Sequence, residues 1–335
     1  MTLTQLRYLV AIADSGLNIT QAAGRVHATQ PGLSKHIKQL EAELGCQLFT
    51  RKGKSLESVT PAGRLVLARA RQVVEECANI RVMVANLRRE NRGELNIATT
   101  HTQARFVLPP VVSALKRRYE DVAVHIHPGG EDEVLGYLDT GQADLVITST
   151  AGNPPPGAFS LPVYRWDRVI LVPRGHELAA KQQRLTLETL ARYPLVSYES
   201  SQRANSSLRQ AFARTGLEPR LAITARDADL IKTYVRAGLG VGVLAEMAIQ
   251  AADLDDLVVL PAQGLFSTCT TWMVLRPDRM LRDFALDFIE LFAPQLGRRE
   301  LRRALEEPGS RRAWPEPPKW GREAVKSPGA VRTRV

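Results

Sequence analysis

The alternation of apolar and polar positions over residues 18–44 predicts two short helices joined by a tight turn. The first helix presents a small apolar face, which consists of Ala22, Ala23 and Val26. The second has apolar residues at spacings of four, three and four positions, which form one buried stripe of Leu33, Ile37, Leu40 and Leu44. We expect Thr20 and Thr29 to cap the two helices, with Pro31 in the first turn of the second, where no backbone N–H is needed.

The face of the second helix opposite this stripe is polar and basic. A helix-turn-helix with such a face is typical of a protein that enters the major groove of DNA. The alternative is a solvated surface on an ordinary helical hairpin. The apolar helix Leu6–Ile12 and the basic turn after Thr50 favour DNA binding, because they supply a third helix and a wing. The residues expected to contact DNA are Thr29, Gln30, Pro31, Ser34, Lys35, Lys38, Arg51 and Lys52.

A helical pattern without a breaker runs from Thr60 to about Arg89. Apolar residues recur in it every 3.5 positions on average, as is typical of a coiled-coil seam: Val66, Ala70, Val73, Cys77, Ile80, Val84 and Leu87. The alternative is a long helix that packs only on its own domain. The pattern predicts a head over residues 1–60 and a linker helix over 61–92 that pairs two copies of the chain.

Beyond residue 92 the pattern changes to short apolar runs that alternate with helical segments. Strands alternating with helices predict a parallel-rich α/β body over residues 93–297. The composition shifts again after Gly297, where Arg, Pro and Gly dominate. We expect a short frayed helix at 299–307 and then disorder to residue 335.

The composition narrows the class of protein. The 335 residues carry a net charge of +10, with basic ends and an acidic middle, which suits a DNA-binding head joined to a separate body. No signal peptide and no membrane span are expected, and three isolated cysteines fit a reducing cytoplasm. His125 and His127 lack a third ligand nearby in sequence, and no catalytic motif is present. The chain is therefore not expected to be an enzyme or to hold a metal or cofactor.

A polar cluster ends the first predicted strand of the body and opens its first helix. It comprises Thr99, Thr100, Thr102 and Gln103. Open α/β sheets bind ligands at the carboxyl ends of their strands, where a helix N-terminus offers free N–H groups to an anion. Simple N-capping by one of the threonines explains the same cluster without a ligand. The spacing alone leaves both readings open.

The head resembles the LysR-type transcriptional regulators. The resemblance runs from LRYLVAIADSG through TQPGLSKHIKQLEAELGCQLFTR to VTPAG, with Ile19 where the family usually has Phe. It implies a winged helix-turn-helix head, a linker helix that pairs subunits, and a two-lobed effector domain like the periplasmic binding proteins. The chain would cross between the lobes near 162–163 and again near 264–268. Promoter DNA, further copies of the chain (a dimer or a tetramer) and RNA polymerase are the implied macromolecular partners.

The body resembles the CysB-like branch of that family, the activators of cysteine biosynthesis. The strings that carry this likeness are TTHTQAR, Tyr164-x-Trp166 and the stretch from Asp227 to Arg236 with the GLGVGV after it. The resemblance implies a cleft that binds a sulfate-like anion or an acetylated serine. By position, the effector-binding residues would be Thr100, Thr102, Gln103, Ser149 and Trp166.

One departure from the branch lies after the 195–198 strand. This chain has Glu199-Ser-Ser-Gln-Arg203 where a small Gly- or Thr-containing loop is usual. Arg203 could pair with the effector or narrow the pocket. The sequence therefore predicts a regulator of cysteine biosynthesis and sulfate assimilation, and the alternative is a LysR-type regulator that answers to another small carboxylate, of aromatic or nitrogen metabolism.

Overall fold

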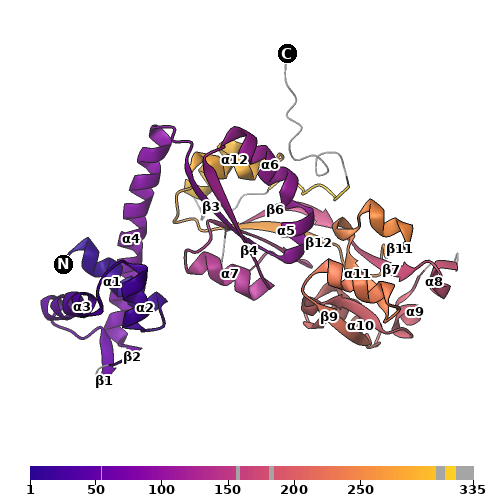
Figure 1. The fold of residues 1–335 in the computed structure, drawn as a ribbon, viewed down its shortest axis with the longest axis horizontal. Helices are drawn as coiled ribbons and strands as arrows, with labels where there is room; N and C mark the ends of the chain where they lie inside the picture. The colour runs from indigo at the N-terminus through magenta and orange to yellow at the C-terminus, as the bar shows by residue number, and fades with distance from the viewer. Residues whose placement is uncertain (54, 156–158, 181–184, 307–313, 322–335) are drawn as a thin grey trace, which may run out of the picture. The chain divides into compact units, whose positions relative to one another are not determined.

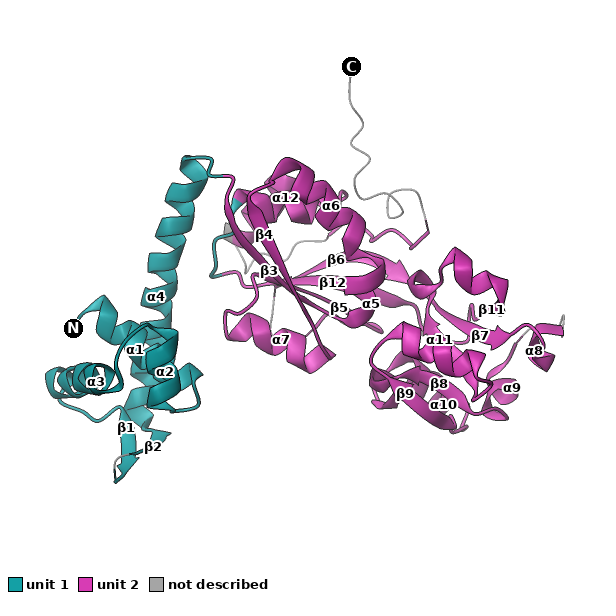
Figure 2. Ribbon diagram, viewed as in Figure 1, with its two compact units in different colours: residues 1–90, 278–282 teal, residues 91–277, 283–335 magenta. Residues whose placement is uncertain are grey.

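The computed structural model describes residues 1–53, 55–155, 159–180, 185–306 and 314–321 (Figure 1). The chain divides into two compact units (Figure 2). The first contains residues 1–90 and 278–282, and the second contains residues 91–277 and 283–335. No helix in the described ranges is long and apolar enough to span a bilayer.

The first unit begins with three helices and a two-stranded wing. The helices are α1 (Leu3–Asp14), α2 (Ile19–Arg25) and α3 (Gln30–Leu44), and the wing pairs β1 (Phe49–Lys52) with β2 (Ser55–Val59). Apolar residues from all three helices form one core with Leu48 and Phe49. The predicted stripe of α3 is buried at Leu33, Ile37 and Leu40, but Leu44 is exposed because it ends the helix.

Helix caps explain where these elements begin. The Thr29 side chain accepts a hydrogen bond from the Gly32 N–H, as predicted, so α3 begins at Gln30. The cap predicted for α2 is wrong: Asn18, not Thr20, caps it by accepting from the Gln21 N–H at 3.0 Å. Asn is the better N-cap of the two, and the apolar pattern alone did not separate two positions that lie so close together.

The long helix α4 (Pro61–Leu87) follows the wing, and Thr60 caps it. Its first half packs on the head, where Ala70 is buried and Gly63 lies so close to the Leu48 carbonyl that a Cβ would be 2.1 Å from that oxygen. Further along, Val73 and Ile80 are 45% and 50% exposed. The same helix therefore supports the head and presents part of the predicted seam to solvent.

The second unit holds two lobes, each built on a five-stranded sheet. In lobe I the strand order is β4-β3-β5-β12-β6, and the strands are β3 (Gly93–Thr99), β4 (Val122–Pro128), β5 (Leu145–Thr150), β6 (Phe159–Trp166) and β12 (Cys269–Leu275). The helices of this lobe are α5 (His101–Phe106), α6 (Leu108–Arg118), α7 (Glu131–Asp139) and α12 (Asp283–Phe292). Figure 1 shows α6 and α12 on one side of this sheet and α7 on the other.

Lobe II has the strand order β11-β7-β10-β8-β9. Its strands are β7 (Arg168–Pro173), β8 (Leu195–Tyr198), β9 (Leu221–Ala225), β10 (Val241–Ala245) and β11 (Leu257–Pro261). Its helices are α8 (Glu177–Ala180), α9 (Leu187–Ala191), α10 (Ser207–Arg214) and α11 (Ala228–Arg236), with short 3-10 turns η1 (Glu199–Gln202), η2 (Glu246–Ala248) and η3 (Ala251–Asp255). In each sheet three neighbouring strands at one edge pair in parallel: β3 with β4 and β5 in lobe I, and β8 with β9 and β10 in lobe II.

The chain crosses between the lobes at Asp167 and again between Pro261 and Cys269. The first crossover predicted near 162–163 is wrong. Strand β6 continues through that position to Trp166, which pairs with Cys269 of β12, and Arg168 already belongs to the lobe II sheet. The return lies in the interval that contains the predicted 264–268.

Beyond the lobes, a short helix α13 (Arg298–Glu306) is held by ion pairs from Arg298 and Arg302 to Asp283. Residues 314–321 lie along the edge strand β6, where Arg165 exchanges backbone hydrogen bonds with Pro318 and Trp320. The Trp320 ring packs 5.1 Å from that of Tyr164. The disorder expected after α13 is therefore wrong for this segment, because aromatic packing and an open strand edge hold it; residues 307–313 and 322–335 lie outside the described residues.

Candidate functional site

Helix α3 presents most of the residues that were predicted to contact DNA. Thr29, Gln30, Pro31, Lys35 and Lys38 are exposed, and Ser34 is half-buried. A shallow groove on this helix is lined by Pro31, Ser34, Lys35, Lys38, Gln39 and Ala42. The groove contains two ammonium groups and no carboxylate among its lining residues. This arrangement suits a polyanion, and Gln39 and Ala42 are the members that the sequence analysis missed.

The two basic residues predicted on the wing differ in their surroundings. Arg51 forms an ion pair with Glu41 of α3, at 2.6 Å between Nη2 and Oε2. The other oxygen of Glu41 accepts a hydrogen bond from the Leu48 N–H at 2.9 Å. Arg51 is thus tied into the joint between α3 and β1, whereas Lys52 is exposed near the tip of the wing.

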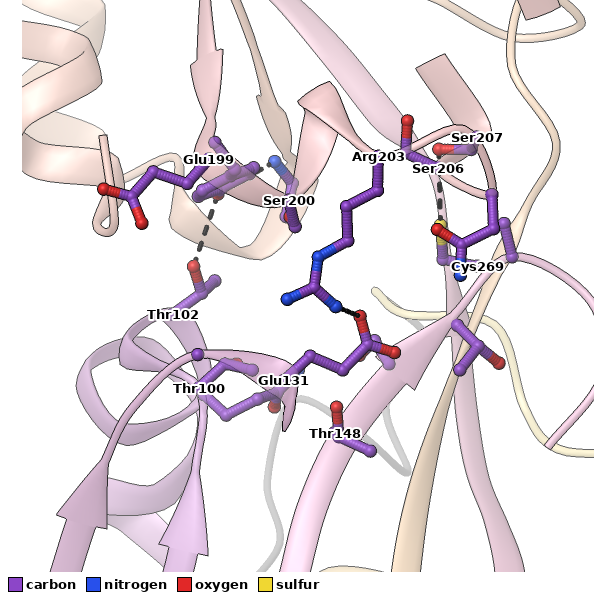
Figure 3. Close-up of a pocket in the computed structure, with 18 of the residues that line it drawn as sticks. Thr100, Thr102, Glu131, Thr148, Glu199, Ser200, Arg203, Ser206, Ser207 and Cys269 are labelled. Carbon is purple, nitrogen blue, oxygen red and sulfur yellow. Dashed lines mark hydrogen bonds and ion pairs between the residues drawn. The ribbon is translucent and has the colours of Figure 1, made fainter. Parts of the chain in front are cut away.

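A cavity of about 570 Å³ lies between the two lobes of the second unit (Figure 3). The predicted effector-binding residues Thr100, Thr102, Gln103, Ser149, Trp166 and Arg203 all line it. They lie at the carboxyl ends of β3, β5 and β6 and just after η1. The structure therefore brings together residues that the sequence separates by more than a hundred positions.

Several of these side chains are linked to one another by hydrogen bonds. The Trp166 Nε1–H donates to Ser149 Oγ at 3.2 Å, and Ser149 Oγ lies 2.9 Å from Thr271 Oγ1. The buried Gln103 amide donates to Thr271 and accepts from the Tyr164 hydroxyl. Burial raises the pKa of Tyr164, so this phenol is a neutral donor. The network fixes Ser149 and Trp166 on the wall of the cavity and uses both ends of the Gln103 amide.

The threonines at the end of β3 do not act as helix caps in the described structure. Thr100 occupies the N-cap position of α5, but its side chain makes no capping hydrogen bond. Thr99 donates to the Ile147 carbonyl at 2.8 Å, and Thr102 donates to the Tyr198 hydroxyl at 3.3 Å. The N-capping explanation of this cluster is therefore not supported, and the Thr100 side chain lines the cavity.

Arg203 joins the two lobes across the cavity. Its guanidinium lies 3.1 Å from Glu131 Oε2 and 3.0 Å from Asp132 Oδ2, both at the start of α7 in lobe I. Figure 3 shows the Arg203 side chain extended toward Glu131. Burial raises the pKa of Glu131, and the charge of Arg203 opposes that rise only in part. Arg203 was expected either to pair with the effector or to narrow the pocket. In the structure its guanidinium is already paired with two carboxylates of the protein.

The cavity also contains polar residues that the sequence analysis did not single out. They are Glu131, Thr148, Arg168, Tyr198 and Ser207. Thr148 and Tyr198 lie near the carboxyl ends of β5 and β8, so the strand-end rule could have found them. Arg168 begins a strand and Ser207 begins a helix, and neither position carries a local signal.

The residues with metal-binding side chains do not gather at this cavity or elsewhere in the described structure. No group of three or more His, Cys, Asp or Glu side chains in the described ranges is placed to hold a metal ion. The His127 ring lies beside Asn96 and Tyr137. Asp227 caps α11 by accepting from the Leu230 N–H at 2.9 Å.

Comparison with known proteins assigns the chain to a family. The family model of bacterial regulatory helix-turn-helix proteins of the lysR family matches residues 3–64, and that of the LysR substrate binding domain matches residues 88–297. The chain therefore belongs to the LysR family of DNA-binding transcriptional regulators, with a helix-turn-helix head and a two-lobed α/β effector domain as predicted.

Individual relatives indicate which branch of the family this chain resembles. The HTH-type transcriptional regulator CysB of Haemophilus influenzae is 41% identical over 304 residues, which cover 91% of this chain and 94% of that protein. The regulator cbl of Klebsiella aerogenes is 37% identical over 92% of this chain and 97% of its own. The crystal structure of the cofactor-binding domain of the Cbl regulator matches 65% of this chain and 95% of its own, with a TM-score of 0.61 and 35% identity. The predicted likeness to the CysB-like branch is confirmed.

Proposed function

We propose that this LysR-type protein regulates genes of cysteine biosynthesis and sulfate assimilation, under the control of a small effector that binds between the two lobes. The proposed effector is an acetylserine or a sulfate-like anion. The observation that carries the proposal is the cavity between the lobes, which is lined by Thr100, Ser149 and Trp166. The 41% identity to a CysB regulator across nearly the whole chain supports it.

In the proposed mechanism the first unit binds DNA and pairs two copies of the chain, and the second unit binds the effector. The exposed face of α3 reads promoter DNA, and the exposed seam of α4 pairs two copies of the chain. The effector acts by binding one arrangement of the assembly more tightly than another, because equal binding to both would shift nothing. Contact with RNA polymerase belongs to the same proposal.

The residues around Arg203 bear on the identity of the effector. Arg203 is engaged by Glu131 and Asp132, so an anion that uses this guanidinium must compete with two carboxylates. This departure from the branch keeps a different small carboxylate as the second candidate.

The experiment that tests the proposal is calorimetric titration of the full-length protein with N-acetylserine, O-acetylserine and sulfate. We expect at least one of them to bind, and Thr100→Ala to weaken that binding about five- to a hundredfold, because a buried ligand oxygen loses its partner. Thr140→Ala is the matched control, since Thr140 is exposed on lobe I outside the cavity. If the wild type binds none of the three, or Thr100→Ala binds them equally well, the sulfur effector is wrong and another carboxylate becomes the leading candidate.

A further inference from the structure

The side chain of Arg168 is a buried cation on the lobe II wall of the effector cavity. Arg168 is the first residue of β7 and is only 6% exposed. Its Nε–H donates to Ser207 Oγ at 2.7 Å, which holds the guanidinium in one orientation. Among the described residues no carboxylate forms an ion pair with Arg168, and its Nη1 atom has no hydrogen-bond partner.

The other two arginines that line the cavity each form ion pairs with carboxylates. Arg203 pairs with Glu131 and Asp132, and Arg226 pairs with Glu199 at 3.2 Å. Among the lining residues that the structure describes, Glu131, Asp132 and Glu199 are the only acidic side chains, and each forms an ion pair with Arg203 or Arg226. Arg168 is therefore the one arginine of the described lining that has no anionic partner.

The groups beside Arg168 do not supply the missing negative charge. Burial raises the pKa of the Tyr198 hydroxyl and of the Cys269 thiol, so both are neutral near neutral pH although Arg168 acts in the opposite direction. A buried cation with an unpaired N–H lowers stability, because it has lost its hydration without gaining a partner. A ligand carboxylate would remove that cost and form charge-assisted hydrogen bonds.

The opposite wall offers a second unpaired group. The Thr148 side chain of β5 is fully buried, and its hydroxyl has no hydrogen-bond partner among the described residues. Thr100 on the same lobe adds a second hydroxyl, which makes no capping hydrogen bond to α5. Apart from Glu131 and Asp132, which are paired with Arg203, the lobe I wall thus offers neutral hydroxyls, and lobe II offers an uncompensated cation. This arrangement fits a ligand with a polar neutral end and an acidic end.

We propose that Arg168 binds the carboxylate of the effector, so that the acid group lies against lobe II while the rest of the ligand faces the hydroxyls of lobe I. This inference rests on the proposed function, because it takes the cavity to be the effector site. It makes Arg168 the residue that selects a carboxylic acid over its neutral amide.

The test compares each acetylserine isomer with its own carboxamide, by calorimetric titration of the full-length protein. The wild type should bind the acid about ten- to a hundredfold more tightly than the amide, which is the range expected for one charged hydrogen-bonded pair. Arg168→Gln should bring the acid to the affinity of the amide and leave the amide unchanged. Arg168→Lys should keep part of the preference, and Arg226→Gln, in the same cavity but paired with Glu199, should keep all of it.

Different failures have different meanings. Equal binding of acid and amide by the wild type, or a full acid preference in a folded Arg168→Gln variant, would overturn the assignment of Arg168 and leave the proposed function standing. The wild-type comparison needs no variant, so a misfolded Arg168→Gln protein does not prevent the test. Binding of sulfate alone would overturn the carboxylate assignment, and binding of no probe at all would overturn both proposals.

Discussion

The Arg203 guanidinium of lobe II and the Glu131 carboxylate of lobe I form an ion pair of 3.1 Å across the cavity between the lobes. Thr102 and Tyr198 form a hydrogen bond between the same lobes, and Arg105 forms an ion pair with Asp229. These three contacts link lobe I to lobe II. Any movement that separates the lobes must break them, so their strength determines how easily the cavity opens.

Glu131 makes the stability of the folded protein sensitive to pH. Burial raises its pKa above the ordinary value of 4.5, so the folded protein holds the Glu131 proton more tightly than the unfolded chain does. The stability contributed by this group is therefore complete below its unfolded pKa and is lost as the pH rises through its folded pKa. The Glu131→Gln side chain does not titrate, so it does not lose this stability. We therefore expect the melting temperature of Glu131→Gln minus that of the wild type to increase as the pH rises.

Thermal unfolding of both proteins from acidic to neutral pH measures this difference. Glu120→Gln, at an exposed position on lobe I, is the control and should leave the wild-type pH dependence intact. A difference between Glu131→Gln and wild type that falls as the pH rises would contradict the assignment.

On the recognition helix, Gln30 and Ser34 are expected to contact base edges. Each such contact is worth about 1–3 kcal/mol at one base pair. The double variant Gln30→Ala, Ser34→Ala should therefore lose discrimination at particular operator positions, measured by anisotropy titration with a set of substituted operators. Wild-type affinity and specificity in that variant would refute this role for α3.

The wing separates two kinds of basic residue. Lys52 is exposed, so Lys52→Ala should weaken binding to all DNA sequences and reduce the slope of log affinity against log salt by about 0.9. Arg51 is paired with Glu41, so we expect Arg51→Ala to lower the melting temperature of the protein and to change the salt slope less than Lys52→Ala does. The reverse order of salt effects would show that Arg51, rather than Lys52, contacts phosphate.

The exposed apolar residues of α4 predict its role in assembly. A carboxylate at Val73 and at Ile80 would be buried against a second copy of the helix, where an unpaired charge is strongly unfavourable. Val73→Glu, Ile80→Glu should therefore lose both oligomerisation and operator binding in sedimentation and anisotropy experiments. Gln72→Glu adds a charge beside the seam and should have neither effect. An unchanged oligomer in the double variant would mean that the 3.5-residue period reflects packing within one chain.

The features that could be predicted from sequence depend on local periodicity. The stripe of Leu33, Ile37 and Leu40 defines α3, and the cap at Thr29 gives its first residue, because both signals lie within a few turns of the chain. The threonines after β3 were found for a similar reason, since strand ends in an α/β sheet are ligand-binding positions. The exact residue at which a helix begins is harder to predict, as the cap of α2 at Asn18 rather than Thr20 shows.

The features that sequence could not supply depend on contacts between distant segments. Arg168 becomes a cavity residue because β7 starts at the crossover, and Ser207, which accepts a hydrogen bond from its Nε–H, comes from another element. The first crossover was misplaced because β6 stays apolar through Val163 and its end is set by pairing with Cys269. Similarly, the Trp320 ring packs against Tyr164, more than 150 positions away.

We propose that a small sulfur-related effector, bound between the lobes, changes how the head binds DNA. The most direct measurement is an anisotropy titration of the full-length protein on promoter DNA from a cysteine-biosynthesis gene, with and without saturating acetylserine. We expect specific binding and an effector-dependent change in affinity of at least about fivefold, the lower range of a typical allosteric coupling. Identical titration curves, under conditions where calorimetry shows the cavity to be occupied, would contradict it.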